Sequence, residues 1–263
     1  MRLAIRHEMV LGYGTAQAYS ICQLRLTPRA DGGQRVLWWQ LAGTGNHQPF
    51  LDAFGNACHM LTRTGAHHEL RLVAEGEVEI LARDGGRVPE VGTIAPLAFA
   101  MPTRLTGADA TVTQFAARHL AKRPRGDDYL CLAQAIGAAI TYQSGAHAID
   151  ASASDALRLG AGGSHDHAHL FLACCHARQI PARFISGYLD PGGSGPARCH
   201  AWIDVWVEEV DYSGWVGIDV THARFEDEAL CRLAIGRDHD SAAPLRMVRP
   251  GGTTLQIAVD VCQ

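Results

Sequence analysis

The sequence lacks the features that mark several large classes of protein. It has no broad basic region, since its short basic cluster at residues 122–125 is followed at once by Asp127 and Asp128, and the formal net charge is −4. We therefore expect no nucleic-acid partner. No apolar run approaches the length needed to cross a bilayer, and charged residues occupy the start of the chain, where a signal peptide needs an apolar stretch. We expect a cytoplasmic protein with no membrane partner.

Cysteine is present, but not in the spacing of a disulfide scaffold or a redox motif. The eight cysteines are scattered along the chain and include no C-x-x-C pair. In a reducing cytoplasm, such residues pack as small buried apolar groups. The chain also has no internal repeat and no low-complexity tract, and its 47% hydrophobic and 19% charged residues are typical of a globular protein. Its length suits one large domain or two modest ones.

The first hundred residues have the pattern of antiparallel β-structure. Short strand-like segments alternate with turn signals; the segments are residues 20–26, 35–41 and 68–80, and the turn signals are residues 31–33, 55–56 and 84–86. The longest segment partly alternates apolar with polar side chains, as a strand does when one face covers a core. We predict an antiparallel β-sandwich over residues 1–100, with a connector near residues 89–102.

The rest of the chain, residues 101–263, mixes helical and strand patterns. We predict helices at residues 111–120, 127–142, 154–159 and 164–179. Strands are expected at residues 182–188, 199–207, 214–220 and 254–261. The fold class is therefore α+β, with the sandwich preceding a mixed domain.

A serine stands at the predicted start of a buried helix. Ser164 follows Gly162-Gly163, and the unpaired backbone N–H groups and the helix dipole at such a position favour negative charge. A nucleophile there is assisted, and the same N–H groups can hold a developing oxyanion. Serine is also a common N-cap, so the local sequence alone leaves a structural role open.

A histidine and an aspartate follow on later strands. His200 begins an aromatic-rich strand and could face a cleft as a general base. Asp219 ends the next apolar strand, and it can orient His200 if the two strands are neighbours. Viewed singly, each is better explained as an ordinary strand-end or turn residue. It is the order of the three residues that suggests a catalytic triad.

The order of these segments and their sequence motifs resemble those of transglutaminase-like proteins. The family pattern GVCQDFAHLF is similar to GGSHDHAHLF at residues 162–171, and GIPARYVSGY is similar to QIPARFISGY at residues 179–188. HAWVEV and GWVGFDPT have counterparts in HAWIDV and GWVGIDVT, at residues 200–205 and 214–221. The N-terminal region, through residues 24–29, 33–34 and 52–56, resembles the companion β-domain of the bacterial members.

The resemblance spans nearly the whole chain and implies a specific fold and chemistry. The fold is a papain-like α+β core behind a β-sandwich, and the activity is acyl transfer or amide hydrolysis on a peptide or protein substrate without a cofactor. The catalytic residues carried over are Ser164, His200 and Asp219, and we predict that His165, Asp166 and Trp202 support the cleft. Association of family members with peptide-ligase-like enzymes suggests a partner of that kind.

The chain departs from the family where it matters most, because Ser164 stands in place of the catalytic cysteine. A thiol can be held as a thiolate beside an imidazolium, whereas a serine hydroxyl loses its proton only during attack. An introduced Cys-to-Ser substitution would leave the neighbours alone, yet Gly163, His165 and His167 also differ from the pattern. Three interpretations stay open: an introduced substitution, which these neighbouring differences weaken; a serine acyl hydrolase; and a protein that has lost the chemistry and binds a peptide or partner enzyme.

A histidine-rich run suggests a further, separate alternative. His165, Asp166, His167 and His169 include ligand types that zinc commonly takes, so a zinc-dependent hydrolase using His165, Asp166 and His169 is a second alternative function. In a helix, His165 and His169 share a face while His167 points elsewhere. The metal alternative therefore excludes His167 from the ligand set.

Overall fold

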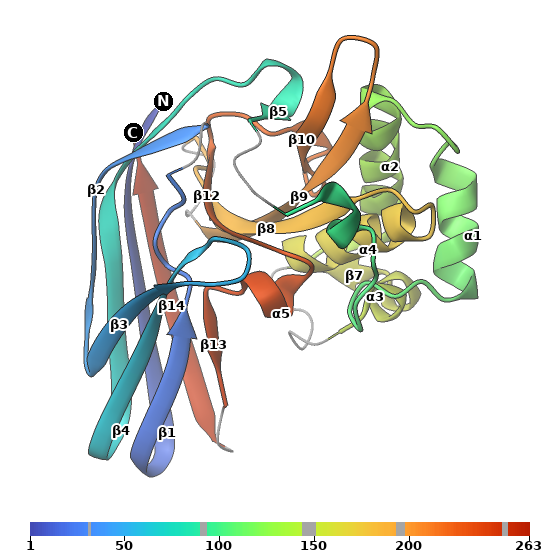
Figure 1. Ribbon diagram of the computed structural model, residues 1–263. Helices are drawn as coiled ribbons and strands as arrows, with labels where there is room; N and C mark the ends of the chain where they lie inside the picture. The colour runs from blue at the N-terminus through green and yellow to red at the C-terminus, as the bar shows by residue number, and fades with distance from the viewer. Residues whose placement is uncertain (31–32, 90–93, 144–150, 193–197, 249–251) are drawn as a thin grey trace.

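The computed structural model describes residues 1–30, 33–89, 94–143, 151–192, 198–248 and 252–263. Three layers follow one another in Figure 1: a long β-sheet region, a central sheet, and a group of helices on the far side of that sheet. The predicted α+β class is confirmed, with a β-rich region preceding a mixed core. The turn expected at residues 31–33 falls mostly outside the described residues.

The β-rich region is one antiparallel sheet built on two very long strands. These are β1 (Arg2–Leu24) and β4 (Ala57–Ile80), and they pair along most of their length. Inward-facing residues alternate with outward-facing ones, as the period of a strand requires. The remaining strands are β2 (Gln34–Gly43), β3 (Asn46–Leu51), β13 (Leu245–Met247) and β14 (Thr253–Cys262).

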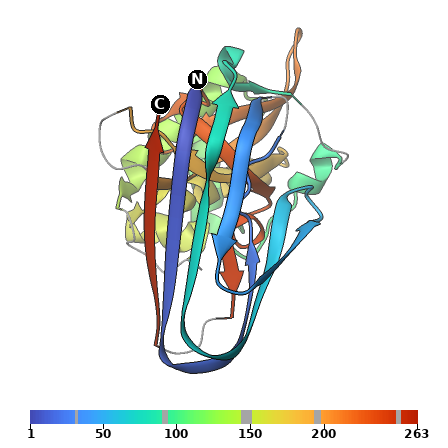
Figure 2. The same cartoon turned by 90° about the vertical axis from the view of Figure 1, so that its left-hand side faces the viewer.

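Both long strands bend sharply midway, and the sheet thereby folds over itself (Figure 2). The register between the two strands shifts twice between Gly12 and Tyr19, and Gly65 adopts a φ of 84° near the same place. Strand β14 pairs with the first half of β1 and β13 with its end, while β2 and β3 pair with opposite halves of β4. Side chains from both halves, including Met9, Leu24 and Leu72, share one buried cluster. The expected sandwich is thus made from a single folded sheet.

Strand pairing crosses the division expected at residue 100. Strand β14 pairs with β1, so the end of the chain completes the sheet that the beginning started. Conversely, β5 (Arg87–Val88) leaves the first region and pairs with β10 (Ser213–Asp219) of the core. The expected ranges 1–100 and 101–263 therefore do not separate the two sheets, because their outer strands come from the other side of that division.

The central sheet is antiparallel and runs in the order β11-β10-β9-β8-β12. Its strands are β8 (Ala182–Leu189), β9 (Arg198–Glu208), β10 (Ser213–Asp219), β11 (Arg224–Phe225) and β12 (Leu230–Gly236). Strand β12 was not among the predicted strands. Every residue of β12 is buried, including Arg232, whose charge interrupts an otherwise apolar strand pattern.

The helices cover one face of the central sheet. They are α1 (Ala110–His119), α2 (Gly126–Ala139), α3 (Ala153–Leu159) and α4 (Ser164–His176), with the short α5 (His239–Ala242) near β12. Helix α4 is the central one: it packs on β8 and β9, and eleven of its thirteen residues, from Asp166 to His176, are buried. It ends three residues earlier than predicted, in a turn where Gln179 takes a φ of 59°. Among the described residues, no helix has the length and apolar character needed to cross a membrane.

The expected connector contributes short elements where it is described. Residues 90–93 lie outside the described ranges, but η1 (Asp84–Gly86) precedes them and η2 (Pro96–Phe99) follows. Phe99 is buried edge-on against Trp215 of β10, with ring centroids 5.6 Å apart. The connector is therefore partly a packed segment. Two further short strands, β6 (Thr141–Tyr142) and β7 (Ala161–Gly162), pair in parallel just before α4.

Side-chain amides from the first region cover the outer edge of β12. Asn56 donates to the carbonyl of Ile235 at 2.7 Å and accepts from its N–H at 2.8 Å. Gln34 does the same for Arg232, at 2.8 Å and 2.9 Å. An edge strand otherwise presents unpaired backbone groups, and a buried unpaired group costs free energy. The two amides act as a substitute neighbouring strand and hold the sandwich against the core.

A buried cluster of charges lies on the face of the central sheet away from α4. Arg232 donates twice to Asp204, at 2.6 and 2.8 Å, and also binds Glu226. Arg183 binds Asp204 at 2.8 Å, and Arg83 from the first region binds Glu226. The side chains of Arg232, Asp204 and Glu226 are all inaccessible to solvent. Such groups are stable in the interior only while each charge keeps its partners.

Replacing Arg232 should therefore be far more damaging than replacing an exposed arginine. We expect Arg232→Met to lower the free energy of unfolding by about 3–5 kcal/mol, because Asp204 and Glu226 lose their main partner while staying buried. Arg35→Met removes an ion pair with Glu79 at 2.7 Å in which Arg35 is 69% exposed, and should cost less than about 1 kcal/mol. Equilibrium urea unfolding of both variants tests this. Equal costs would show that the buried cluster contributes nothing specific.

Four buried histidines are held in their neutral form. Burial lowers the pKa of His7 to about 4, and burial is also the main cause that lowers the pKa of His167, His169 and His176. In the unfolded chain a histidine titrates near its ordinary value of about 6.5. As the pH falls through that value, these histidines bind protons in the unfolded chain but stay unprotonated in the folded protein. The folded state is therefore destabilised by acid.

We expect the free energy of unfolding to fall steeply below about pH 6.5, by up to about 1.4 kcal/mol per pH unit for each of these histidines. His169→Gln should flatten the slope by up to one such increment, because glutamine cannot take a proton. Glutamine can still accept the backbone N–H of His239, which His169 Nε2 accepts at 3.1 Å in the native protein. Urea unfolding across this pH range measures the slope. His68→Gln, at an exposed position, is the control that should leave it unchanged. If His169→Gln leaves the pH slope of the unfolding free energy unaltered, His169 does not contribute to the acid destabilisation.

Candidate active site

Ser164 is the first residue of helix α4 and not its cap. The cap is Gly163, whose N–H is accepted by the Asp166 carboxylate at 2.7 Å. The structural alternative considered for Ser164, an N-cap, is therefore not the role it plays. Its hydroxyl instead accepts the backbone N–H of Ala201, on β9, at 3.2 Å. Because the N–H groups of a first helical turn lack intrahelical partners, the half-buried Ser164 lies where anionic charge is stabilised.

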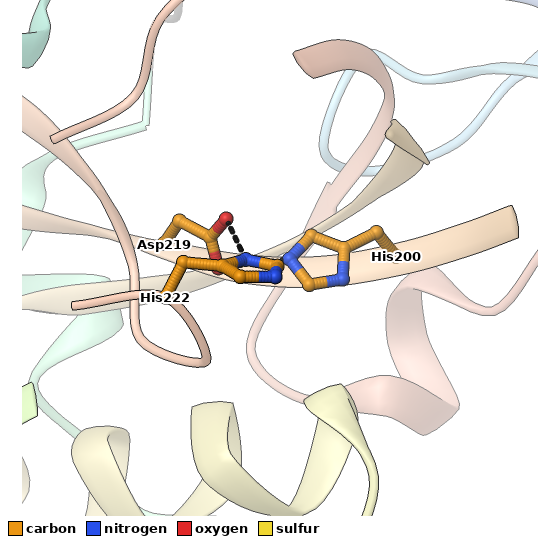
Figure 3. A group of neighbouring side chains, drawn as sticks. All are labelled: His200, Asp219 and His222. Atoms are coloured by element: carbon orange, nitrogen blue, oxygen red, sulfur yellow. Dashed lines mark hydrogen bonds and ion pairs between the residues drawn. The ribbon is translucent and has the colours of Figure 1, made fainter. Parts of the chain in front are cut away.

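His200 and Asp219 form a buried hydrogen-bonded pair (Figure 3). Strands β9 and β10 are paired neighbours, with Ile203 opposite Ile218, so the ends that carry the two residues lie close together. His200 Nε2 is 2.8 Å from Asp219 Oδ1, and the two side chains are 1% and 0% exposed. Burial opposes the charge on Asp219, but the hydrogen bonds from His200 and His222 outweigh it, so the pKa of Asp219 lies well below its usual range. Asp219 is thus a carboxylate that holds His200 in place.

The Ser164 hydroxyl contacts the backbone next to this pair. Ala201, which binds the Ser164 hydroxyl, directly follows His200 on β9. Within the described ranges, no hydrogen bond joins the Ser164 hydroxyl to the His200 ring itself. Catalytic hydrogen bonds are often long or misaligned before substrate binds. The structure brings the start of α4 to the backbone beside the His200–Asp219 pair, through the hydrogen bond between Ala201 and Ser164.

A second histidine, which the sequence analysis missed, shares the same carboxylate. His222 Nδ1 is 2.7 Å from Asp219 Oδ2, and the ring centroids of His222 and His200 are 5.5 Å apart (Figure 3). The turn between β10 and β11 reverses the chain, so His222 comes back over the strand end; Ala223 takes a φ of 49° in this turn. A usable signal was present in the sequence, because a titratable residue three positions after a strand-end carboxylate can return to it in a tight turn.

The three residues expected to support the cleft have different roles. Asp166 is buried as the capping partner of Gly163, and His165 lies beside it, with His165 Nε2 3.3 Å from Asp166 Oδ2. Trp202 is fully buried and stacks on His200, with ring centroids 6.2 Å apart and an interplanar angle of 22°. Its indole N–H donates to Glu226 at 3.2 Å. Trp202 thus connects the orientation of the His200 ring to the buried charge cluster.

A cleft of about 660 Å³ opens beside the two histidines. Of the predicted triad, His200 is the member that lines it; the other lining residues include Tyr142, Arg198, Thr221, His222 and Arg224. Arg198 donates to the Tyr142 hydroxyl at 3.0 Å. The cleft is therefore polar around the imidazoles and large enough for part of a peptide.

The zinc ligands suggested by sequence do not form a ligand group. The His165 and His169 rings do share a face of α4, 6.3 Å apart, and His167 points elsewhere, toward the carbonyl of Ile140. His169 Nε2, however, accepts the backbone N–H of His239, so this atom is occupied. Across the described part of the chain, the group whose potential ligand atoms all lie within 4.8 Å of one another is His200, Asp219 and His222.

Comparison with protein families agrees with this architecture. Residues 3–79 match the bacterial transglutaminase-like N-terminal region, and residues 113–220 match the transglutaminase-like superfamily. The second match contains Ser164, His200 and Asp219. It ends one residue after Asp219 and does not include His222.

Similar proteins occur in mycobacteria. The chain is 26% identical over 289 residues to an uncharacterized protein of Mycobacterium tuberculosis, covering 99% of this chain and 92% of the relative. It is 25% identical over 279 residues to an uncharacterized protein of Mycobacterium leprae, covering 99% and 98%. Among solved structures, a candidate cysteine protease of Cytophaga hutchinsonii superposes with a TM-score of 0.80 at 20% identity, over 100% of this chain and 90% of the other. At that identity the likeness shows the fold alone. The chain thus combines a bacterial transglutaminase-like N-terminal region with a transglutaminase-like core.

Proposed function

We propose that this protein is an acyl transferase or amide hydrolase that acts on a peptide or protein substrate. Ser164 is the nucleophile, His200 the general base and Asp219 the residue that orients the base. The observation that carries the proposal is the buried His200–Asp219 pair, held at 2.8 Å beside the start of α4, where the Ser164 hydroxyl binds the residue next to His200.

The assignment of the two ring nitrogens follows from this pair. Asp219 is ionised and accepts at Oδ1, so His200 Nε2 carries the proton and donates it. His200 Nδ1 is then left with the lone pair, which is the atom that can remove a proton from Ser164. An ionised and buried carboxylate also stabilises the imidazolium that forms.

The reaction proceeds in two acyl-transfer steps. The Ser164 oxygen attacks the substrate carbonyl while its proton moves to His200 Nδ1, and the backbone N–H groups at the start of α4 stabilise the oxyanion. When the intermediate collapses, the carbon–nitrogen bond breaks, and the leaving amine takes the proton from His200. An amine or water then attacks the acyl-serine, with His200 again removing a proton, and Ser164 is regenerated.

A second candidate function is binding without turnover. It is supported by the hydrogen bond that the Ser164 hydroxyl accepts from Ala201, since among the described residues this serine makes no bond to the His200 ring. In that case the cleft would hold a peptide segment or a peptide-ligase-like partner enzyme. The two candidates differ in whether Ser164 forms a covalent bond with an acyl or phosphonyl group.

The hydrolase proposal predicts covalent labelling of Ser164 by a fluorophosphonate probe. His200 must take the serine proton during this reaction, so His200→Ala should slow labelling at least about a hundredfold. Peptide mass spectrometry locates the label, and Ser213→Ala, a change at an exposed strand residue, is the matched control. A folded protein that carries no label on Ser164 would favour the binding function.

Ser164→Cys should restore thiol chemistry. A cysteine at the start of a helix and beside an imidazole forms a thiolate more readily than an ordinary cysteine. We expect its alkylation by iodoacetamide near neutral pH to exceed that of the exposed Cys131, which serves as an internal reference within α2. Rates at each cysteine can be followed by peptide mass spectrometry. If the introduced thiol reacts more slowly than Cys131, the nucleophile position is closed to small reagents.

A further inference from the structure

We propose that His200, Asp219 and His222 form a binding site for a zinc ion, and that zinc bound there prevents His200 from acting as a base. The first part concerns binding alone and is independent of the proposed function. The second part rests on that function, because it concerns the proton that His200 would remove from Ser164. The two parts are therefore tested by separate measurements.

The atoms that would hold the ion already face one another. His200 Nε2 and His222 Nδ1 lie 2.8 Å and 2.7 Å from the two oxygens of the Asp219 carboxylate, and all the potential ligand atoms lie within 4.8 Å of one another. Zinc binds imidazole nitrogen and carboxylate oxygen at about 2.0–2.2 Å, so tetrahedral ligand atoms are separated by about 3.3 Å. The two hydrogen-bonded nitrogen–oxygen distances are shorter than this by about 0.5 Å, and the ligand atoms all lie within 4.8 Å of one another, so shifts of the side chains bring them to zinc-binding distances.

The mobility needed for this adjustment lies in His222. The side chains of His200 and Asp219 are 1% and 0% exposed and are fixed by packing, whereas that of His222 is 46% exposed and sits on a turn. His200 and His222 both line the 660 Å³ cleft, so the ion can enter from there, and water can complete the coordination. Two histidines and one carboxylate with an open position are a common zinc set.

The charges around the site select the kind of ion. Asp219 supplies one negative charge, and the two imidazoles supply nitrogen, which suits zinc better than magnesium or calcium, since these prefer oxygen ligands. Arg224 opposes a cation, because its Nε lies 3.5 Å from Asp219 Oδ2. Arg224 is also paired with Asp227, on its other side, and is about one-third exposed, so it can turn outward. The removal of Arg224 should therefore tighten binding.

The effect on His200 follows from the position of one proton. In the absence of metal, His200 Nε2 carries the proton and Nδ1 the lone pair. Zinc takes the Nε2 lone pair, so the single proton of the neutral ring must reside on Nδ1. With its proton on Nδ1, His200 donates toward Ser164 and can no longer accept from it. Bound zinc would also occupy the carboxylate that stabilises the imidazolium.

Binding is measured on the untagged full chain with zinc chloride and with cobalt chloride as a spectroscopic substitute. Calorimetry in competition with a chelator should give one specific zinc site per chain. His222→Ala should weaken it at least about a hundredfold, since even loss of residues that support a metal ligand commonly costs ten- to a hundredfold. His68→Ala, which removes an exposed histidine of β4, should leave it unchanged, and Arg224→Gln should tighten it.

Cobalt distinguishes this site from adventitious binding by the free cysteines. Cobalt bound to nitrogen and oxygen gives visible ligand-field bands without the intense thiolate charge-transfer band. The proposal predicts such a spectrum for the wild type and its loss in His222→Ala. A thiolate spectrum, equal zinc affinity in His222→Ala and wild type, or no zinc binding at all would each overturn the site. Measurement on the wild type keeps the test valid even if a variant folds poorly.

The consequence for His200 has its own test. Nitrogen-15 NMR of the histidine rings should show the His200 proton on Nε2 without zinc and on Nδ1 with one equivalent of zinc. Fluorophosphonate labelling of Ser164 should fall in parallel with zinc occupancy in the wild type, while the labelling of His222→Ala stays insensitive to the same zinc concentration. An unchanged tautomer, or labelling that zinc leaves intact or increases, would overturn the blocking role. If Ser164 is not labelled even without zinc, the proposed function fails, while the cobalt spectrum and the tautomer still decide the zinc site.

Discussion

One guanidinium sealed between two carboxylates constrains most of this structure. Arg232 lies on β12, Asp204 on β9, and Glu226 follows β11, so their ion pairs connect the two ends of the strand order in the central sheet. Arg83 adds the first region to the same cluster through Glu226. Charges this deeply buried tolerate little displacement, because an unpaired one costs several kcal/mol, on the order of 3–5. The strand that carries His200 is thereby fixed relative to both its neighbours and the sandwich.

The constraint reaches the candidate active site through one aromatic ring. Trp202 donates to Glu226 and stacks on His200, so the charge cluster and the imidazole share a rigid intermediate. On the other side of His200, Asp219 is held by the end of β10. The imidazole is thus restrained in both plane and direction, which is what a base requires if it is to meet a proton without reorganisation. The geometry of the candidate active site depends on the packing between two sheets as much as on the site itself.

The sequence predicted what depends on local patterns and missed what depends on distant pairing. The start of α4 at Ser164 and the strands that carry His200 and Asp219 follow from short motifs and periodicity, and the structure agrees with them. Strand β12 was missed because Arg232 interrupts its apolar pattern, and the partners that make this charge acceptable are distant in sequence. The pairing of β14 with β1 joins the two ends of the chain, a relation that no local pattern contains. His222 was overlooked because its contact with Asp219 depends on the tight turn between them, which only its spacing of three residues from Asp219 signals in the sequence.

The second imidazole, that of His222, is relevant to the serine at position 164, where the transglutaminase-like pattern has a cysteine. A thiolate nucleophile needs a protonated histidine beside it, whereas a serine needs a neutral one that can accept a proton. In this protein Asp219 divides its two oxygens between His200 and His222, at 2.8 and 2.7 Å. Because Oδ1 accepts from His200 Nε2, the proposed mechanism has the ring present Nδ1, with its lone pair, to the proton of Ser164. His222 occupies the other oxygen, so the carboxylate that orients the proposed base is held by two imidazoles at once.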